Sequence, residues 1–329
     1  MKKYAKYLSI ILCIVMIFSI TACKAEKETP HEAANITVAC LKGPTGVGMA
    51  PLMDKNDSKT AANNYTFTIA SAADEISGKI ISGEINIASV PTNLAAKLYN
   101  KTEGKLVMLA VNTLGVLSIL ENGNTVKSVA DLKGKTIYST GEGSNPEYIL
   151  RHVLSENGID PDKDVTIRFL AANDELTAAL ISGTAQIAMV PEPAATTILA
   201  KKDTVNRVLN INDEWEKISD SKLMMGCVVA LKSYVGANPD AIRSFLDEYK
   251  TSIETAQNDI KSSAALCEKY GIIPTAAVAE KAIPECNLTF ASGAEMKSSI
   301  EGYFEVLLNA DKTSIGGKLP ADDFYYNEK

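Results

Sequence analysis

The chain has 329 residues, of which 46% are apolar and 22% charged, and its net charge is −7. This length and composition predict about two globular domains with a real core. The acidic balance, without a basic patch, argues against nucleic acid as a partner. The two histidines, His31 and His152, leave little scope for a histidine-based metal or catalytic site.

The N-terminus predicts a targeting segment. A basic stretch, MKKYAKY, precedes the apolar stretch LSIILCIVMIFSITA, which ends at Cys23. A membrane-spanning helix needs about 20 apolar residues, so the apolar stretch is short for a permanent span. A small-residue run that stops at a cysteine is typical of a bacterial lipoprotein signal. We expect a signal peptide over 1–22, lipidation such as palmitoylation at Cys23, and a flexible tether over 23–35.

The alternative is a plain secretory cleavage site with an incidental cysteine. With two or more acyl chains, the protein would be anchored stably to the cell membrane, on its extracytoplasmic face. The sequence thus favours a lipid-anchored protein of the Gram-positive type.

The next segments alternate between strand and helix. The expected order is a strand at 35–41, a glycine-rich loop at 43–48 that opens a helix, a strand at 65–70, a helix closed by Gly83, a strand at 85–90, a helix at 92–101 and a strand at 105–113. Residues 115–122 then continue extended. Strands alternating with short helices predict βαβ units and parallel sheets.

The same plan follows a second time. We expect a strand at 135–140, a glycine loop and a helix beginning near Pro146, a strand at 164–170, a helix at 173–183, a strand at 185–190, a helix at 193–201 and a strand at 205–211. After an apolar segment at 223–233 the pattern becomes helical, with a long helix capped by Asn238-Pro239-Asp240 and others at 260–270, 275–282 and 294–309. Two α/β lobes with a C-terminal helical layer are therefore predicted.

A repeated motif supports two related lobes. ISGEINIASVP at 81–91 and ISGTAQIAMVP at 181–191 are identical at seven of eleven positions. Their spacing of 100 residues exceeds the period of a solenoid, which is roughly 20 to 50 residues. Ligands of parallel sheets bind beyond the carboxyl ends of the strands. Pro91 and Pro191 mark two such ends, so we expect the loops after them to face one crevice between the lobes.

The candidate ligand-binding residues lie in the loops at these strand ends. They are Gly43, Thr45, Gly46, Val47, Thr92, Asn93, Asn112, Thr113, Ser144, Asn145 and Glu192. Glycines let the backbone approach a ligand closely, and helix N-termini offer free N–H groups. The alternatives are a bare strand-to-helix turn for the glycines, helix capping for the Ser, Thr and Asn residues, and a solvated acid for Glu192.

The expected ligand charge depends on Glu192. If its carboxylate faces the crevice, it favours a cationic or N–H-rich ligand. No arginine falls in these loops, and arginine is the usual partner of flat oxyanions. An anion bound by backbone N–H groups remains the second choice.

Three other features leave two interpretations each. Trp215 is a stacking wall for the ligand or a packing residue. Cys267 and Cys286 form a disulfide or remain buried thiols, and the absence of C-x-x-C spacing argues against zinc. His152 lies in a predicted helix, where a structural role is favoured over catalysis.

Four segments resemble the periplasmic-type substrate-binding proteins of ABC importers. They are LKGPTGVGMAPLM, ISGEINIASVPTNLAAKLYNKTEGK, VADLKGKTIY and KLPADDFYY. The resemblance is greatest to the group that takes up sulfonates, nitrate or thiamine-pyrimidine precursors. It implies a type II two-lobe α/β fold, with two parallel-type sheets flanked by helices and hinges near 114–121 and 223–231. Lobe 1 would comprise 36–115 plus 229–329, and lobe 2 would comprise 116–228.

The resemblance also implies a function. The protein would be an extracytoplasmic solute-binding lipoprotein that captures a small organic nutrient, such as a nitrogen heterocycle of the thiamine-pyrimidine-precursor type. It would deliver this ligand to the permease of an ABC transporter and its ATPase, as a monomer without cofactor, metal or catalytic residues. The alternatives are a sulfonate/taurine- or nitrate-type anion-binding protein and an exported enzyme on the same fold.

Overall fold

The computed structural model describes residues 33–327. The chain divides into Met1–Glu32 and Ala33–Lys329, and every described residue belongs to the second part. The expected signal peptide and the lipidation site Cys23 lie outside the described residues. Within 33–327, no helix combines the length and the apolar character needed to cross a bilayer.

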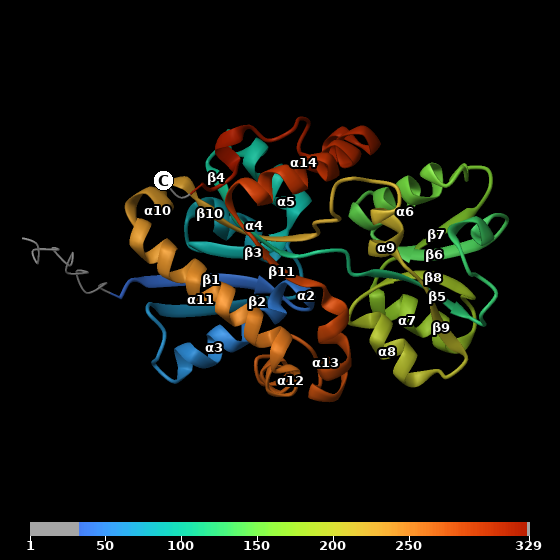
Figure 1. Cartoon of the computed structure of the whole chain (residues 1–329), viewed down its shortest axis with the longest axis horizontal. Helices are drawn as coiled ribbons and strands as arrows, with labels where there is room; N and C mark the ends of the chain where they lie inside the picture. The colour runs from blue at the N-terminus through green and yellow to red at the C-terminus, as the bar shows by residue number, and fades with distance from the viewer. Residues whose placement is uncertain (1–32, 328–329) are drawn as a thin grey trace, which may run out of the picture. The chain divides into compact units, whose positions relative to one another are not determined.

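The first of two sheets has six strands in the order β11-β4-β10-β3-β1-β2 (Figure 1). The strands are β1 (Asn35–Leu41), β2 (Asn64–Ala70), β3 (Ile87–Pro91), β4 (Leu106–Thr113), β10 (Gly226–Leu231) and β11 (Leu288–Ala291). β1 is parallel to β2 and β3, whereas β10 is antiparallel to β3 and β4. We call this sheet with its helices the first lobe.

The second sheet has five strands in the order β7-β6-β8-β5-β9. They are β5 (Leu117–Asn122), β6 (Thr136–Thr140), β7 (Thr166–Leu170), β8 (Ile187–Pro191) and β9 (Val205–Asn210). β6 is parallel to β7 and β8, while β5 is antiparallel to β8 and β9. This sheet with its helices is the second lobe. Both sheets are therefore mixed, because β10 and β5 each enter their sheet from the opposite lobe.

The two sheets share one plan. The order β4-β10-β3-β1-β2 in the first corresponds to β9-β5-β8-β6-β7 in the second. The repeated sequence motif supplies β3 and β8, which occupy equivalent central places. The helix before each of them ends at a glycine with left-handed backbone, Gly83 at φ 81° and Gly183 at φ 82°. Glycine adopts this conformation without strain, which explains why both copies keep it.

Helices cover both sheets (Figure 1). In the first lobe they are α2 (Pro44–Val47), α3 (Ala50–Asp57), α4 (Asp74–Ser82), α5 (Thr92–Lys101), α10 (Lys232–Ala237), α11 (Pro239–Asn258), α12 (Ile260–Lys269), α13 (Ala276–Ala282) and α14 (Gly293–Ala310). In the second lobe they are α6 (Asn145–Glu156), α7 (Asn173–Ser182), α8 (Ala194–Lys201) and α9 (Ile211–Glu216). Short 3₁₀ turns are η1 (Val129–Leu132), η2 (Ile283–Cys286), η3 (Lys312–Ile315) and η4 (Asp322–Phe324).

The strand β4 shows why a strand inside the first sheet has a continuous apolar sequence. All eight of its residues are buried, including the polar pair Asn112 and Thr113 at its end. A strand covered by helices on both faces shows a continuous apolar run in place of alternation. Hydrogen bonds offset the cost of burying Asn112, because its Nδ2 donates to the Ser89 and Tyr249 hydroxyl oxygens at 2.7 and 2.8 Å.

Two segments connect the sheets. The chain leaves β4 for β5 through 114–116, and it returns from α9 to β10 through 217–225. The side chain of Asn287 donates to the Gly115 carbonyl at the first connection. Near the second, Trp215 is fully buried, and its ring lies 5.7 Å from that of Tyr303 in α14 and 5.0 Å from that of His152 in α6. Trp215 therefore packs between elements of both lobes.

Candidate ligand-binding cleft

A cavity of about 400 Å³, which we call the cleft, is lined by both lobes. Its lining comprises Leu41, Lys42, Pro44, Thr45, Ala73, Pro91, Asn93, Leu94, Thr113, Val116, Ser144, Asn145, Pro146 and Met225. Most of these residues end a strand or begin a helix, as expected for the carboxyl edge of an α/β sheet. The loop after Pro91 lines this cleft, as the repeated motif predicts, whereas no residue of the loop after Pro191 belongs to the described lining.

Three helices of eight or more residues start at the cleft. Ala73 is the N-cap of α4, Asn93 is in the first turn of α5, and Asn145 is the first residue of α6. The first N–H groups of a helix have no partner inside the helix, and the helix dipole makes this end positive. An anion is therefore the type of group that these helix ends favour.

The charged side chains reinforce this electrostatic pattern. Lys42 is the one charged residue of the described lining, and no carboxylate belongs to that lining. Lys42 follows the end of β1, where its N–H donates to the Ala70 carbonyl at 3.0 Å. The sequence analysis predicts no role for Lys42, since arginine is the usual partner of flat oxyanions. Its position directly before the glycine-rich loop was the signal available.

Within the cleft lining, Asn145 has a buried polar atom without a hydrogen-bond partner among the described residues. The residue is 5% exposed, and its buried Oδ1 has no hydrogen-bond partner among residues 33–327. An unpaired buried polar atom costs about 1–3 kcal/mol. Because Oδ1 is an acceptor, a ligand relieves that cost only through a group that donates a hydrogen bond. The Nδ2 of the same amide can donate to an anionic oxygen.

The other predicted polar residues of the lining are bonded in different ways. The Thr113 hydroxyl donates to Oδ1 of Asn112 at 3.0 Å, so Asn112 supports Thr113 from beneath the cleft. The Ser144 hydroxyl donates to the Gly141 carbonyl at 2.6 Å, within the loop before α6. Thr45 and Asn93 line the cleft directly.

Thr92, although predicted, does not belong to the lining. It is buried, its hydroxyl donates to the Met224 carbonyl at 2.7 Å, and its N–H donates to the Met225 carbonyl at 3.1 Å. These bonds tie the start of α5 to the chain that enters β10. In the structure Thr92 therefore holds the edge of the cleft in place.

The glycine-rich loop forms a tight turn beside the cleft. Gly43 has φ 86°, and its N–H donates to the Ile272 carbonyl at 3.0 Å. A Cβ on Gly46 would lie 2.3 Å from the Leu41 carbonyl oxygen, so only glycine fits there. Val47 is fully buried. Gly43, Gly46 and Val47 lie outside the lining, and the glycines shape the turn that presents Lys42 and Thr45.

Glu192 is bonded within the protein. Its carboxylate lies 2.6 Å from Nη2 of Arg207 and accepts a hydrogen bond from the Thr196 N–H at 3.2 Å. Burial raises the pKa of Glu192 above its ordinary value, while Thr196 and Arg207 act in the opposite direction. The structure places this carboxylate against Arg207 and outside the lining, which removes the reason for expecting a cationic ligand.

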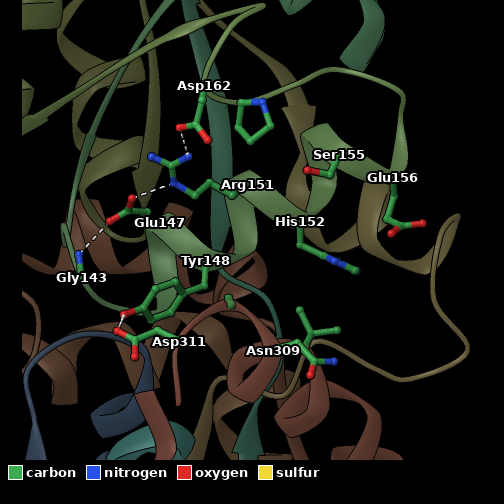
Figure 2. A pocket seen from close by; sticks show the side chains of 13 residues that line it. Gly143, Glu147, Tyr148, Arg151, His152, Ser155, Glu156, Asp162, Asn309 and Asp311 are labelled. Carbon is green, nitrogen blue, oxygen red and sulfur yellow. Dashed lines mark hydrogen bonds and ion pairs between the residues drawn. The ribbon is translucent and has the colours of Figure 1, made fainter. Parts of the chain in front are cut away.

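A larger groove of about 920 Å³ lies between α6 and the end of α14 (Figure 2). Its one arginine pairs with two of its carboxylates. Arg151 lies 2.7 Å from both Glu147 and Asp162, and the Tyr148 hydroxyl donates to Asp311 at 2.9 Å. Burial lowers the pKa of His152, which also lines the groove. Arg151 offsets only part of the negative charge of Glu147, Glu156, Asp162 and Asp311, so this groove is acidic and suits an anion less than the cleft does.

Two open sequence questions are answered by packing. Trp215 is not part of the cleft lining, and its Nε1 donates to the Ser221 carbonyl at 2.7 Å, as suits a packing residue. Cys40, Cys227, Cys267 and Cys286 are all free and buried, so the Cys267–Cys286 disulfide does not form. Burial raises the pKa of Cys40 and of Cys267 to about 12, which keeps both thiols protonated.

Comparison with known families finds one match. The family described as ABC transporter, phosphonate, periplasmic substrate-binding protein matches residues 48–276, more than half of the chain. No curated protein matches the sequence.

Solved structures share the fold. An ABC transporter from Parabacteroides distasonis has a TM-score of 0.76 at 22% identity, over 89% of this chain and 99% of the other. The periplasmic aliphatic sulphonate binding protein of Escherichia coli has a TM-score of 0.66 at 17% identity, covering 86% and 91%. The alkanesulfonate-binding protein of Xanthomonas axonopodis pv. citri, bound to MOPS, has a TM-score of 0.64 at 16% identity, covering 88% and 96%. At these identities the likeness concerns the fold alone.

Proposed function

Because the chain belongs to the phosphonate family of periplasmic substrate-binding proteins of ABC transporters, we propose that it captures a small organic anion in the cleft. It then delivers this ligand to the membrane permease. The single observation that carries the choice of an anion is the charge pattern of the cleft. Three helix N-termini and Lys42 meet there, and the described lining has no carboxylate.

The lining also supports an organic body on that anion. Eight of its residues are apolar: Leu41, Pro44, Ala73, Pro91, Leu94, Val116, Pro146 and Met225. Apolar walls gain free energy by covering hydrocarbon, whereas a bare inorganic ion offers them none. A phosphonate or sulfonate with a short carbon chain therefore suits the cleft better than nitrate does.

A cationic or neutral nitrogen heterocycle, the sequence-based first choice, has less support. That expectation depended on a free carboxylate at Glu192, which is paired with Arg207. A thiamine-pyrimidine precursor would meet Lys42 and the positive helix ends without a compensating negative charge. The sulfonate-type alternative becomes the leading one for this physical reason.

Binding couples to closure of the two lobes. Asn93 and Lys42 belong to the first lobe and Asn145 to the second, so a ligand touches all three only when the lobes are together. A ligand shifts a conformational equilibrium by its differential affinity for the two states. A micromolar site supplies about 8 kcal/mol in all, and the part of it that requires contacts from both lobes favours the closed form.

The proposal extends to the cell surface. The N-terminal sequence supports a lipoprotein that is anchored through acylated Cys23 and faces the extracytoplasmic side. We propose that it acts as a monomer. A tether after Cys23 would let the binding lobes reach the permease while the acyl chains hold them near the membrane.

A calorimetric panel tests the proposed ligand class. We expect ethylphosphonate or ethanesulfonate to bind with micromolar affinity and to raise the melting temperature of the protein. Potassium nitrate is the comparison for an anion without a carbon body. A protonated aminopyrimidine is the comparison for a ligand of opposite charge. Binding of the aminopyrimidine, with no response to either organic anion, would contradict the proposal.

A further inference from the structure

Arg207 joins two carboxylates that belong to different lobes. It lies in β9 of the second lobe, and its Nη2 is 2.6 Å from Glu192, at the end of β8 in the same lobe. Its Nη1 pairs with Glu285, which lies in η2 of the first lobe. A guanidinium can do this because its donors point in several fixed directions, whereas a lysine offers a single point charge.

Burial makes the two halves of this bridge unequal. The Glu192 side chain is 1% exposed, that of Arg207 is 20% exposed, and that of Glu285 is 40% exposed. The inner pair fixes the guanidinium in one orientation, because a buried carboxylate tolerates no loss of its partner. Nη1 of Arg207 then pairs with Glu285 with little further loss of side-chain freedom. The pair with Glu192 in the second lobe therefore orients Arg207 toward Glu285 in the first lobe.

The surroundings favour this contact between the lobes. Arg207 and Glu285 line a groove of about 350 Å³ with Thr196, Leu199, Ala200 and Lys281, between α8 and α13. Close by, a Cβ on Gly43 of the first lobe would lie 3.6 Å from Cδ of Pro193, the neighbour of Glu192. The segment that Arg207 anchors is therefore in contact range of the glycine-rich loop beside the cleft.

We propose that Arg207 is a positioning residue for ligand binding: by bridging Glu192 to Glu285 it latches the lobes together and sets the fraction of protein that is closed. Its effect on affinity rests on the proposed function, because a ligand held by both lobes binds the closed form. The apparent dissociation constant rises when the competent form becomes rarer. Arg207 acts through lobe position and does not line the cleft.

A second polar contact, separate from the Arg207 latch, also joins the lobes. The Tyr148 hydroxyl of α6 donates to Asp311, which follows α14, at 2.9 Å. Figure 1 shows α6 beside α14 and α8 beside α13. The Tyr148 contact lies at the first pair, whereas Arg207 of β9 meets Glu285 of η2, which directly follows α13. Loss of either contact alone leaves the other, and we expect a graded shift toward the open form.

The test uses small-angle X-ray scattering of the protein without added ligand. Glu285→Gln removes the charge from the more exposed partner and leaves the buried pair intact. We expect a larger radius of gyration than in the wild type, and a still larger one for Glu285→Lys. Glu84→Gln is the matched control, because Glu84 pairs with Lys79 inside the first lobe and should leave the radius unchanged.

Salt provides an independent readout. The radius of the wild type should increase from low to high NaCl as the ion pair is screened, and this response should be smaller in Glu285→Gln. With ethylphosphonate as the probe, Glu285→Gln should bind about two- to fivefold more weakly, as expected for a partly exposed ion pair.

The outcomes separate the latch from the proposed function. An unchanged radius in both Glu285 variants overturns the latch, whatever the probe does. A wild type that ignores every organic anion overturns the proposed function, while the scattering result still decides the latch. An unfolding midpoint equal to that of the wild type shows that Glu285→Gln acts on lobe position and leaves folding intact.

Discussion

The guanidinium of Arg207 lies 2.6 Å from the carboxylate of Glu192, fifteen residues earlier in the chain. This contact neutralises the acid that the sequence places after the second strand stop. The cleft is left with Lys42 and helix N-termini as its main electrostatic features. With Glu192 paired, the proposed ligand is an organic anion in place of the cationic or N–H-rich ligand that a free carboxylate would favour.

The first prediction concerns Lys42. Lys42→Gln removes the one cationic side chain of the described lining, and binding of ethylphosphonate should weaken by about tenfold, or 1.4 kcal/mol. The affinity of the variant should also depend less on salt, because screening acts on the lost charge. Titration calorimetry measures both effects. The exposed Lys261 in α12 offers the control Lys261→Gln, and equal losses in the two variants would remove Lys42 from the site.

The second prediction contrasts two asparagines. Asn145→Leu should weaken probe binding by about tenfold while leaving the free energy of unfolding unchanged or higher, because it replaces an unpartnered amide with an apolar group. Asn112→Leu should instead destabilise the protein by about 1–3 kcal/mol, since it leaves the Tyr249 hydroxyl without its partner. Urea denaturation and calorimetry distinguish the two. A destabilised Asn145→Leu with normal binding would assign Asn145 a purely structural role.

The third prediction concerns Glu192. Glu192→Gln should lower the free energy of unfolding by about 1–3 kcal/mol, because Arg207 loses its buried partner and keeps Glu285. The exposed pair Lys297–Glu301 gives the control Glu301→Gln, for which we expect a change below about 0.5 kcal/mol. If Glu192→Gln abolished probe binding at unchanged stability, its carboxylate would contact the ligand after all.

The fourth prediction is a pH dependence in the second lobe. Burial alone would raise the pKa of Glu121, but hydrogen bonds from Thr125 and Val126 outweigh it and hold the pKa below its ordinary value. A depressed carboxyl pKa contributes stability above the unfolded pKa, and this contribution is lost as the pH falls through the folded pKa. Glu121→Gln should therefore destabilise the protein at about pH 7 and have a smaller effect at about pH 3.

Urea denaturation at the two pH values measures this difference. The wild type should lose more stability on acidification than Glu121→Gln does. A variant whose deficit is the same at both pH values would show that the charge of Glu121 contributes nothing.

The fifth prediction depends on the N-terminal sequence alone. Cys23→Ser should release the protein from membranes into the soluble fraction, because the acyl chains would have no attachment site. Cell fractionation followed by immunoblotting measures the distribution. The other cysteine of the same segment supplies the control, since Cys13→Ser should leave the protein with the membrane. Retention of Cys23→Ser would contradict lipidation at this residue.

Much of the backbone plan could be predicted from the repeated motif. The strands before Pro91 and Pro191 and the glycine ends at Gly83 and Gly183 follow from local patterns of apolar residues, proline and glycine. Short elements escaped prediction: α9, α10 and β11 have six, six and four residues, too few for a clear period. β5 was expected only as extended chain, because its partners lie in a sheet that the chain forms later.

The sequence by itself determined that two related α/β lobes present their strand ends to one region, since hydrophobic period, glycine and proline are properties of neighbouring residues. Only the tertiary structure decided which charges remain free there. Glu192 is neutralised by Arg207 from strand β9 of the second sheet. The side chain of Asn112 is hydrogen-bonded to Tyr249, 137 residues away. The net field of a site depends on pairs of side chains brought together by folding, and no local pattern in the chain encodes those pairs.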